Sequence, residues 1–214
     1  MPGTAMKFAS LATILVLAAC IGAACPVHAE SRDQEGIDKS AADAFDSRMF
    51  GATPTKKSYA CFVRKYDSAH VAHHPKQKVS TIKLLMTAEI PSDASTFNYS
   101  FRLGVKYRNR STNLESFGDC GHVVAEDTGQ EIRFGCGVDC DGGGLGVALA
   151  KDDRSAVVGL ARVRLWKRHT APEETAEDLV AGDDDAKFRL DRTALRDCAD
   201  LVTDRKELAE LKRK

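Results

Sequence analysis

The strongest constraint on the fold is an apolar period of two residues that begins near Lys57 and recurs along the rest of the chain. It is clearest in residues 97–107, where apolar side chains occupy the odd positions and polar, charged or glycine residues the even ones. This alternation places successive side chains on opposite faces of an extended strand, one face buried and the other solvated. The period therefore predicts half-buried β-strands and argues against a helical bundle.

The same pattern predicts eight strands, separated by turns rich in Pro, Gly, Asp and Asn. Their approximate ranges are 59–63, 82–90, 97–107, 116–124, 132–140, 145–149, 157–166 and 188–190. No connection holds a helix long enough for a parallel crossover, so neighbouring strands are expected to pair antiparallel. Because closing the sheet removes both exposed edges, we predict an up-and-down barrel or a strongly curled sheet, with a two-sheet sandwich as the alternative.

The chain around these strands divides into distinct segments. Residues 1–29 have the features of a secretory signal, because Lys7 precedes an apolar run too short to span a bilayer. Residues 30–54 are polar and small, which predicts a tether with at most one short helix. Residues 55–192 form the predicted antiparallel domain, and residues 193–214 a C-terminal helical segment packed on the sheet or across one end of a barrel.

Two cleavage sites compete within the signal. Residues 17–20, Leu-Ala-Ala-Cys, have the form of a lipobox, in which Cys20 is lipidated and becomes the mature N-terminus. Residues 27–29, Val-His-Ala, have the small-residue pattern of ordinary cleavage. We therefore expect an exported protein of the bacterial periplasm or cell envelope, lipid-anchored in the first case and soluble in the second.

The cysteines of the strand domain are candidates for disulfide bonds, because an exported chain meets an oxidising compartment. They are Cys61, Cys120, Cys136, Cys140 and Cys198. In an extended strand the α-carbons of Cys136 and Cys140 would lie about 13 Å apart, which is too far for a mutual bond. We predict one bond between Cys61 and Cys198 and a second from Cys120 to either Cys136 or Cys140.

Three histidines, His70, His73 and His74, lie in the connection after the first predicted strand. On a helical turn His70 would share a face with His73 or His74, and imidazole nitrogens bind Zn, Cu or Ni. However, Pro75 indicates a turn, and the segment lacks the adjacent Glu that a zinc peptidase helix supplies. We therefore interpret them as solvated loop histidines and expect no cofactor, with Zn, Cu or Ni binding as the alternative.

No catalytic motif accompanies these residues. No serine lies in a Gly-x-Ser-x-Gly turn, and the glycine run 142–144 precedes an alternating strand instead of the Lys-Ser or Lys-Thr and helix of a phosphate loop. The 31 basic and 31 acidic side chains balance, so no general attraction to nucleic acid is expected. Membrane contact is expected only through a lipid on Cys20.

These observations predict a non-enzymatic binding module for a small ligand or an envelope protein. Interior aromatic positions, Phe97, Tyr99 and Phe101, are candidates for lining a cavity inside the curled sheet. The expected architecture resembles lipocalin-like barrels and small barrel inhibitors of lysozyme, without a shared sequence motif. The alternatives are a metal-binding protein or metal-dependent enzyme that uses the three histidines, and a structural envelope lipoprotein.

Overall fold

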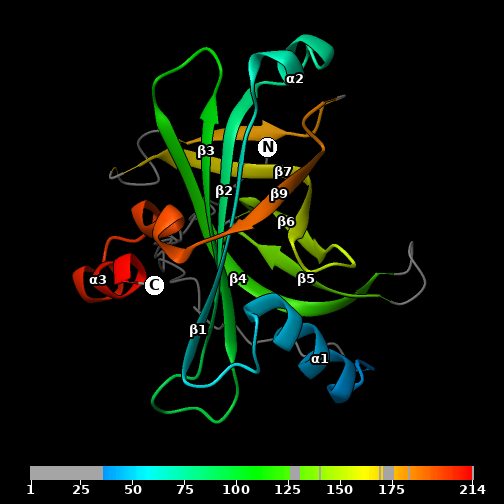
Figure 1. Ribbon diagram of the computed structural model, residues 1–214, viewed down its shortest axis with the longest axis vertical. Coiled ribbons are helices and arrows are strands. Elements are labelled where there is room, and N and C mark those ends of the chain that lie inside the picture. Colours follow the sequence, from blue (N-terminus) through cyan, green and yellow to red (C-terminus); the bar gives the residue numbers. More distant parts are fainter. Residues whose placement is uncertain are drawn as a thin grey trace, which may run out of the picture.

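The computed structural model describes residues 36–125, 131–139, 141–168, 170, 176–182 and 184–213. Within these ranges the chain forms nine strands (Figure 1): β1 (Lys57–Lys65), β2 (Val79–Glu89), β3 (Asn98–Tyr107), β4 (Asn113–Ala125), β5 (Glu131–Gly137), β6 (Gly143–Leu149), β7 (Ser155–Lys167), β8 (Glu177–Val180) and β9 (Lys187–Thr193). The helices described are α1 (Lys39–Phe50), α2 (Ser68–His73), the 3₁₀ helix η2 (Leu195–Leu201) and α3 (Arg205–Arg213).

The strands form one antiparallel sheet that closes on itself. Strands β1 to β6 pair in chain order, β7 pairs with β6, and β9 pairs with both β7 and β1 to complete a ring. The ring is not a regular barrel, because the far end of β7 also pairs with β8 and β4. The predicted closed or strongly curled antiparallel sheet, with a C-terminal helix, is therefore confirmed.

Strand β8 was not expected, since it lies within the acidic connection, residues 170–185, that precedes the last predicted strand. Its four residues carry too short an alternation to be recognised, and only Leu179 is buried, at 1% exposure. The strand is held by antiparallel pairing with β7 over four residues and by the buried Leu179, and Asp178 adds ion pairs to Arg162 (3.3 Å) and Arg164 (3.4 Å). The cross-strand charges indicate the pairing only once the partner strand is known.

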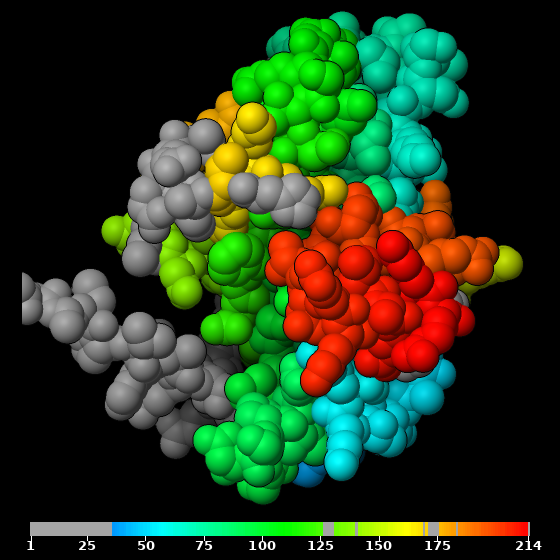
Figure 2. Space-filling view, turned by 90° about the vertical axis from the view of Figure 1, so that its left-hand side faces the viewer, coloured from blue at the N-terminus to red at the C-terminus, as the bar shows by residue number. Residues whose placement is uncertain are grey.

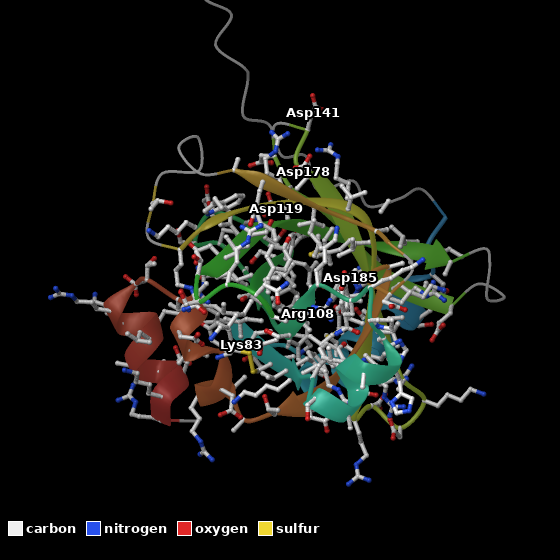
Figure 3. All side chains as sticks on the ribbon, turned by 90° about the horizontal axis from the view of Figure 1, so that it is seen from above. Lys83, Arg108, Asp119, Asp141, Asp178 and Asp185 are labelled. Carbon is white, nitrogen blue, oxygen red and sulfur yellow. A yellow bond between two sulfur atoms is a disulfide. The ribbon has the colours of Figure 1, made fainter. Side chains whose placement is uncertain are left out.

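Large side chains fill the interior of the ring, as the view along its axis shows (Figure 3). Phe62, Phe101, Phe134 and Phe188 come from different strands, and each is at most 1% exposed. Phe101 belongs to the alternating segment that predicted a buried face, and the prediction of burial is correct. The ring interior is therefore a packed hydrophobic core.

Helix α1 lies within the segment that was expected to be a tether. Asp38 caps its first turn by accepting from the backbone N–H of Ala41, and Gly51 ends it with a φ of 78°. Phe45 and Met49, one helical turn apart, are buried in the core of the ring. Two apolar residues at this spacing are enough to dock the helix, although the segment is polar on average.

Arg192 of β9 joins α1 to the ring. Its guanidinium donates to the backbone oxygens of Met49 (2.8 Å), Arg48 (2.9 Å) and Asp153 (2.8 Å), and its carbon lies 4.7 Å from the centre of the Phe62 ring. The last carbonyls of a helix have no partner within the helix, so Arg192 satisfies acceptors that docking would otherwise leave unpaired. Burial lowers the pKa of Arg192, against the effect of the Asp153 charge.

We expect Arg192→Ala to lower the free energy of unfolding by about 2 to 3 kcal/mol, because it removes three hydrogen bonds from a charged donor. Urea unfolding followed by the fluorescence of Trp166, the single tryptophan, measures this change. Arg189→Ala is the control on the same strand, since Arg189 is exposed, and its cost is expected to stay within about 0.5 kcal/mol. Equal effects of the two substitutions would contradict the role of Arg192.

Two disulfide bonds occur among the described residues. Cys61 of β1 is bonded to Cys198 of η2, and Cys120 of β4 is bonded to Cys136, its direct partner in β5. The predicted Cys61–Cys198 bond is confirmed, as is the Cys136 alternative for Cys120. Cys140 and the lipidation candidate Cys20 lie outside the described residues.

The two bonds close loops of very different length, with sequence separations of 137 and 16 residues. A longer loop restricts the unfolded chain more, so replacing Cys61 and Cys198 with Ala is expected to cost about 4 to 5 kcal/mol. Replacing Cys120 and Cys136 should cost about 3 kcal/mol. Urea titrations of the two double variants test this order, and the reverse order would contradict it.

Candidate functional site

A groove opens where β1 and β9 separate. The two strands pair over only three residues, 61–63 with 191–193, and the earlier part of β9 pairs with β7 alone. Beyond this point β9 diverges from β1 and the chain of β1 continues into α2 (Figure 1). The groove has a volume of about 610 Å³, within the range of small-molecule sites. We call it the α2 groove; its lining residues are Arg64, Tyr66, His70, His74, Gln77, Asp184, Ala186, Lys187, Arg189 and Asp191.

One wall of the α2 groove is a column of stacked rings. The centre of the Tyr66 ring lies 4.5 Å from that of His70, which in turn lies 4.3 Å from that of His74. The Arg64 guanidinium lies 5.6 Å from the centre of the Tyr66 ring and extends the column. Asp67 starts α2 by accepting from the backbone N–H of His70 (2.8 Å), which brings His70 beside Tyr66.

Hydrogen bonds fix both histidines of the column. The buried Gln77 donates its amide N–H to the Val79 carbonyl (2.7 Å), so its amide oxygen is left to accept from His70 Nε2 (3.0 Å). Neutral His70 therefore carries its proton on Nε2. His74 Nδ1 lies 3.4 Å from Asp184 Oδ1, which makes this nitrogen the donor of the ring.

Two aspartates attach the segment before β9 to the start of β2. Asp185, 2% exposed, accepts from the backbone N–H groups of Lys78 (2.8 Å) and Val79 (3.4 Å), and Asp184 accepts from that of Lys76 (3.1 Å). Both belong to the acidic connection, which the sequence presents as a solvated loop. No local pattern distinguishes them from the exposed acids nearby, because their partners lie more than a hundred residues away.

The opposite wall of the α2 groove is positively charged. Lys187, Arg189 and Asp191 share the outward face of β9, and Asp191 is paired with Arg64 at 3.0 Å. Among the described residues no carboxylate lies within ion-pair distance of Lys187 or Arg189. Burial raises the pKa of the Tyr66 phenol, so this group stays neutral beside the cations. The groove thus presents two cations without an ion-pair partner among the described residues, next to an aromatic column, and its lining also includes the carboxylates of Asp184 and Asp191.

The structure separates the three histidines of the predicted metal cluster. His70 and His74 line the α2 groove with stacked rings, so their in-plane lone pairs run side by side and do not converge on one point. His73 is exposed and donates Nδ1–H to the Ala69 carbonyl (2.8 Å). In the part of the chain that the structure describes, no three or more His, Cys, Asp or Glu side chains are placed to share a metal ion.

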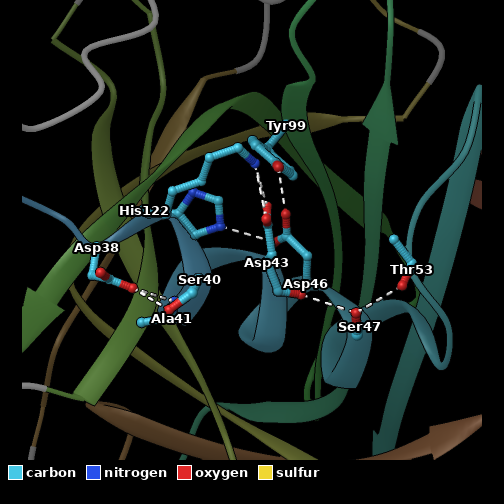
Figure 4. Close-up of polar contacts among 10 residues, drawn as sticks. Asp38, Ser40, Ala41, Asp43, Asp46, Ser47, Thr53, Tyr99 and His122 are labelled. Atoms are coloured by element: carbon cyan, nitrogen blue, oxygen red, sulfur yellow. Dashed lines mark hydrogen bonds and ion pairs between the residues drawn. The ribbon is translucent and has the colours of Figure 1, made fainter.

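The three aromatic residues predicted to line an interior cavity have different environments. Phe101 is fully buried in the packed core, while Phe97 precedes β3 and is half-buried. Tyr99 packs against the core and donates its hydroxyl to Asp46 of α1 (Figure 4). These contacts assign the three side chains to the packing of one end of the ring.

Asp46 is the centre of a buried polar cluster that the sequence did not reveal. It is 4% exposed and accepts from Tyr99 and from His122 Nε2, at 2.8 Å (Figure 4). The rings of Phe45 and Phe134 contact His122 edge-on and obliquely, at 6.0 and 5.0 Å between centres. In the sequence, the only indication of this cluster is that Asp46 lies next to the apolar face of α1. No local pattern relates Asp46 to His122, which lies 76 residues away.

Asp46→Ala is expected to lower the free energy of unfolding by about 2 to 3 kcal/mol, because it removes a buried carboxylate that accepts hydrogen bonds from Tyr99 and His122. Asp43→Ala is a matched control on the same helix, since Asp43 pairs with Lys39 in solvent and contributes about 0.5 kcal/mol or less. Urea unfolding of both variants measures the difference. A cost for Asp46→Ala no greater than that for Asp43→Ala would show that the cluster does not hold α1.

Comparisons with protein-family models, curated proteins and solved structures find no match to the chain. Along its described residues, none of the helices combines the length and the apolar character needed to cross a membrane. The two disulfide bonds are compatible with an oxidising, extracytoplasmic location. The geometry of the α2 groove is therefore the main guide to function.

Proposed function

We propose that the protein is an exported, non-enzymatic binding module of the periplasm or cell envelope, and that its α2 groove binds a small anionic ligand. The observation that carries this proposal is the pair of cations, Lys187 and Arg189, which have no ion-pair partner among the described residues and face the stacked rings of Tyr66, His70 and His74. Arginine binds carboxylate groups through two parallel hydrogen bonds, and lysine adds a point charge. A planar carboxylate suits both walls of the groove.

The location of the groove supports the same conclusion. Packed side chains occupy the interior of the ring, so a ligand is better accommodated at the rim, where the groove is open to solvent. Hydrogen bonds donated by His70 to Gln77 and by His74 to Asp184 hold the two histidines before a ligand arrives. A preorganised wall reduces the entropy that binding has to overcome.

The compartment belongs to the proposal as well. The signal in residues 1–29 supports export, and the lipobox ending at Cys20 supports a lipid anchor as an alternative to a free periplasmic form. Both forms would carry the same folded ring. The disulfide bonds fit either one, since both forms are exposed to the same oxidising compartment.

A titration with benzoate and citrate, followed by the amide NMR signals of the mature chain, tests the proposal. We expect saturable shifts at Arg189, Lys187 and His74, and about tenfold weaker binding in Arg189→Glu, which corresponds to about 1.4 kcal/mol. Lys106→Glu is the control, because Lys106 is an exposed cation on β3 away from the groove. Absence of saturable shifts, or equal weakening by both substitutions, would refute anion binding in the α2 groove.

A further inference from the structure

A second groove, of about 440 Å³, lies on the outer face of β3 and β4 and shares no lining residue with the α2 groove. It is bounded by Leu201 and Thr203 of the C-terminal segment and by Asp139 of the β5–β6 turn. Figure 2 shows this side of the molecule, with the green strands beside the orange and red C-terminal segment. We call it the β3–β4 groove.

The floor of the β3–β4 groove contains an exposed aromatic ring. Phe117 of β4 is 49% exposed, and among the described residues only Val180 is a comparably exposed large apolar side chain. One edge of Phe117 contacts the buried Trp166 of β7, with 4.8 Å between ring centres. The rest of the ring faces solvent, so a partner that covers it gains apolar burial without a rearrangement of the core.

The charged side chains around the aromatic ring of Phe117 are not balanced. Arg102, directly opposite Phe117, is paired with Glu207 (3.3 Å), and Glu115 is paired with Arg168 (3.4 Å). Asp119 and Asp139 also line the groove, and neither has a cation within ion-pair distance among the described residues.

Partial burial, followed by the charge of Asp139, raises the pKa of Asp119. The charge of Asp139 therefore disfavours the ionised form of Asp119 in the free protein, and an arriving cation would relieve this repulsion.

We propose that the β3–β4 groove docks a partner protein through an extended segment that carries lysine or arginine beside an apolar side chain. The cation lies between Asp119 and Asp139, and the apolar side chain covers Phe117. A purely apolar partner would bury two unpaired carboxylates, which is costly, and an acidic partner would add repulsion. A small cation alone would leave the Phe117 ring exposed. The proposal does not depend on anion binding in the α2 groove.

The test uses blocked peptides as probes of the mature, disulfide-bonded chain. We expect the basic peptide Ala-Lys-Leu-Lys-Ala to give saturable amide shifts at Phe117, Asp119 and Asp139, and the acidic peptide Ala-Glu-Leu-Glu-Ala to give none. Spermidine is expected to bind at least tenfold more weakly than the basic peptide. Absence of shifts with the basic peptide, or equal binding of either of the other two probes, would overturn the proposal.

Matched variants assign the binding to these side chains. Phe117→Ala and the double substitution Asp119→Asn with Asp139→Asn are each expected to weaken the basic peptide about tenfold. Val180→Ala and Asp93→Asn are the controls for an exposed apolar side chain and an exposed carboxylate, and should leave binding unchanged. Wild-type affinity in the Phe117 or aspartate variants, or equal losses in the controls, would overturn the assignment.

The pH dependence gives an independent readout. Binding of a cation favours ionised Asp119, so peptide affinity should fall as the pH is lowered through the pKa of this carboxyl, and the peptide should lower that pKa. The carboxyl ¹³C signal of Asp119, followed with and without peptide, measures the shift. An Asp119 pKa that the peptide leaves unchanged would overturn the docking geometry.

Discussion

The three residue pairs that join β1 to β9 are the contact on which the rest of the structure depends. Cys61, in the first pair, continues through its disulfide bond into η2 and the C-terminal segment. Arg192, in the second, lies over Phe62 and holds the C-terminal end of α1. Asp191, in the third, pairs with Arg64 at the edge of the α2 groove. Closure of the sheet, docking of α1 and the edge of the α2 groove therefore all depend on these three residue pairs.

The β1–β9 pairing is only three residue pairs long, which explains why the α2 groove opens beside it. Strand β1 ends at Lys65 and the chain turns into α2, while the preceding part of β9 is fully paired with β7. Side-chain contacts from Asp184 and Asp185 attach the segment before β9 to the start of β2 at the edge of the groove. A longer β1–β9 ladder would close the groove. Because the interior is packed, the hollow at this point lies on the rim of the ring.

The sequence predicted the parts of the fold that repeat or obey strict geometry. Alternation located eight of the nine described strands, and Cys136 is bonded to Cys120 as one of the two predicted alternatives, although β5 ends at Gly137 and not at residue 140. It missed β8, whose four residues show too short an alternation, and it did not predict the docking of α1, which depends on Phe45 and Met49 within a polar segment. For the site it selected His70 and His74 but missed Gln77, Asp184 and Arg189, since distant contacts alone define their roles.

Overall neutrality concealed the most informative electrostatic feature of the molecule. The equal numbers of acidic and basic side chains correctly argue against a general field, but they say nothing of how charges are paired locally. Fields of exposed charges are screened over about 8 to 10 Å in physiological salt, so each groove is governed by its own residues. Among the residues that the structure describes, Lys187 and Arg189 have no ion-pair partner on one side of the molecule, and Asp119 and Asp139 have none on another. A chain with no net charge can therefore offer separate surfaces to an anion and to a cationic partner, and occupation of one need not weaken the other.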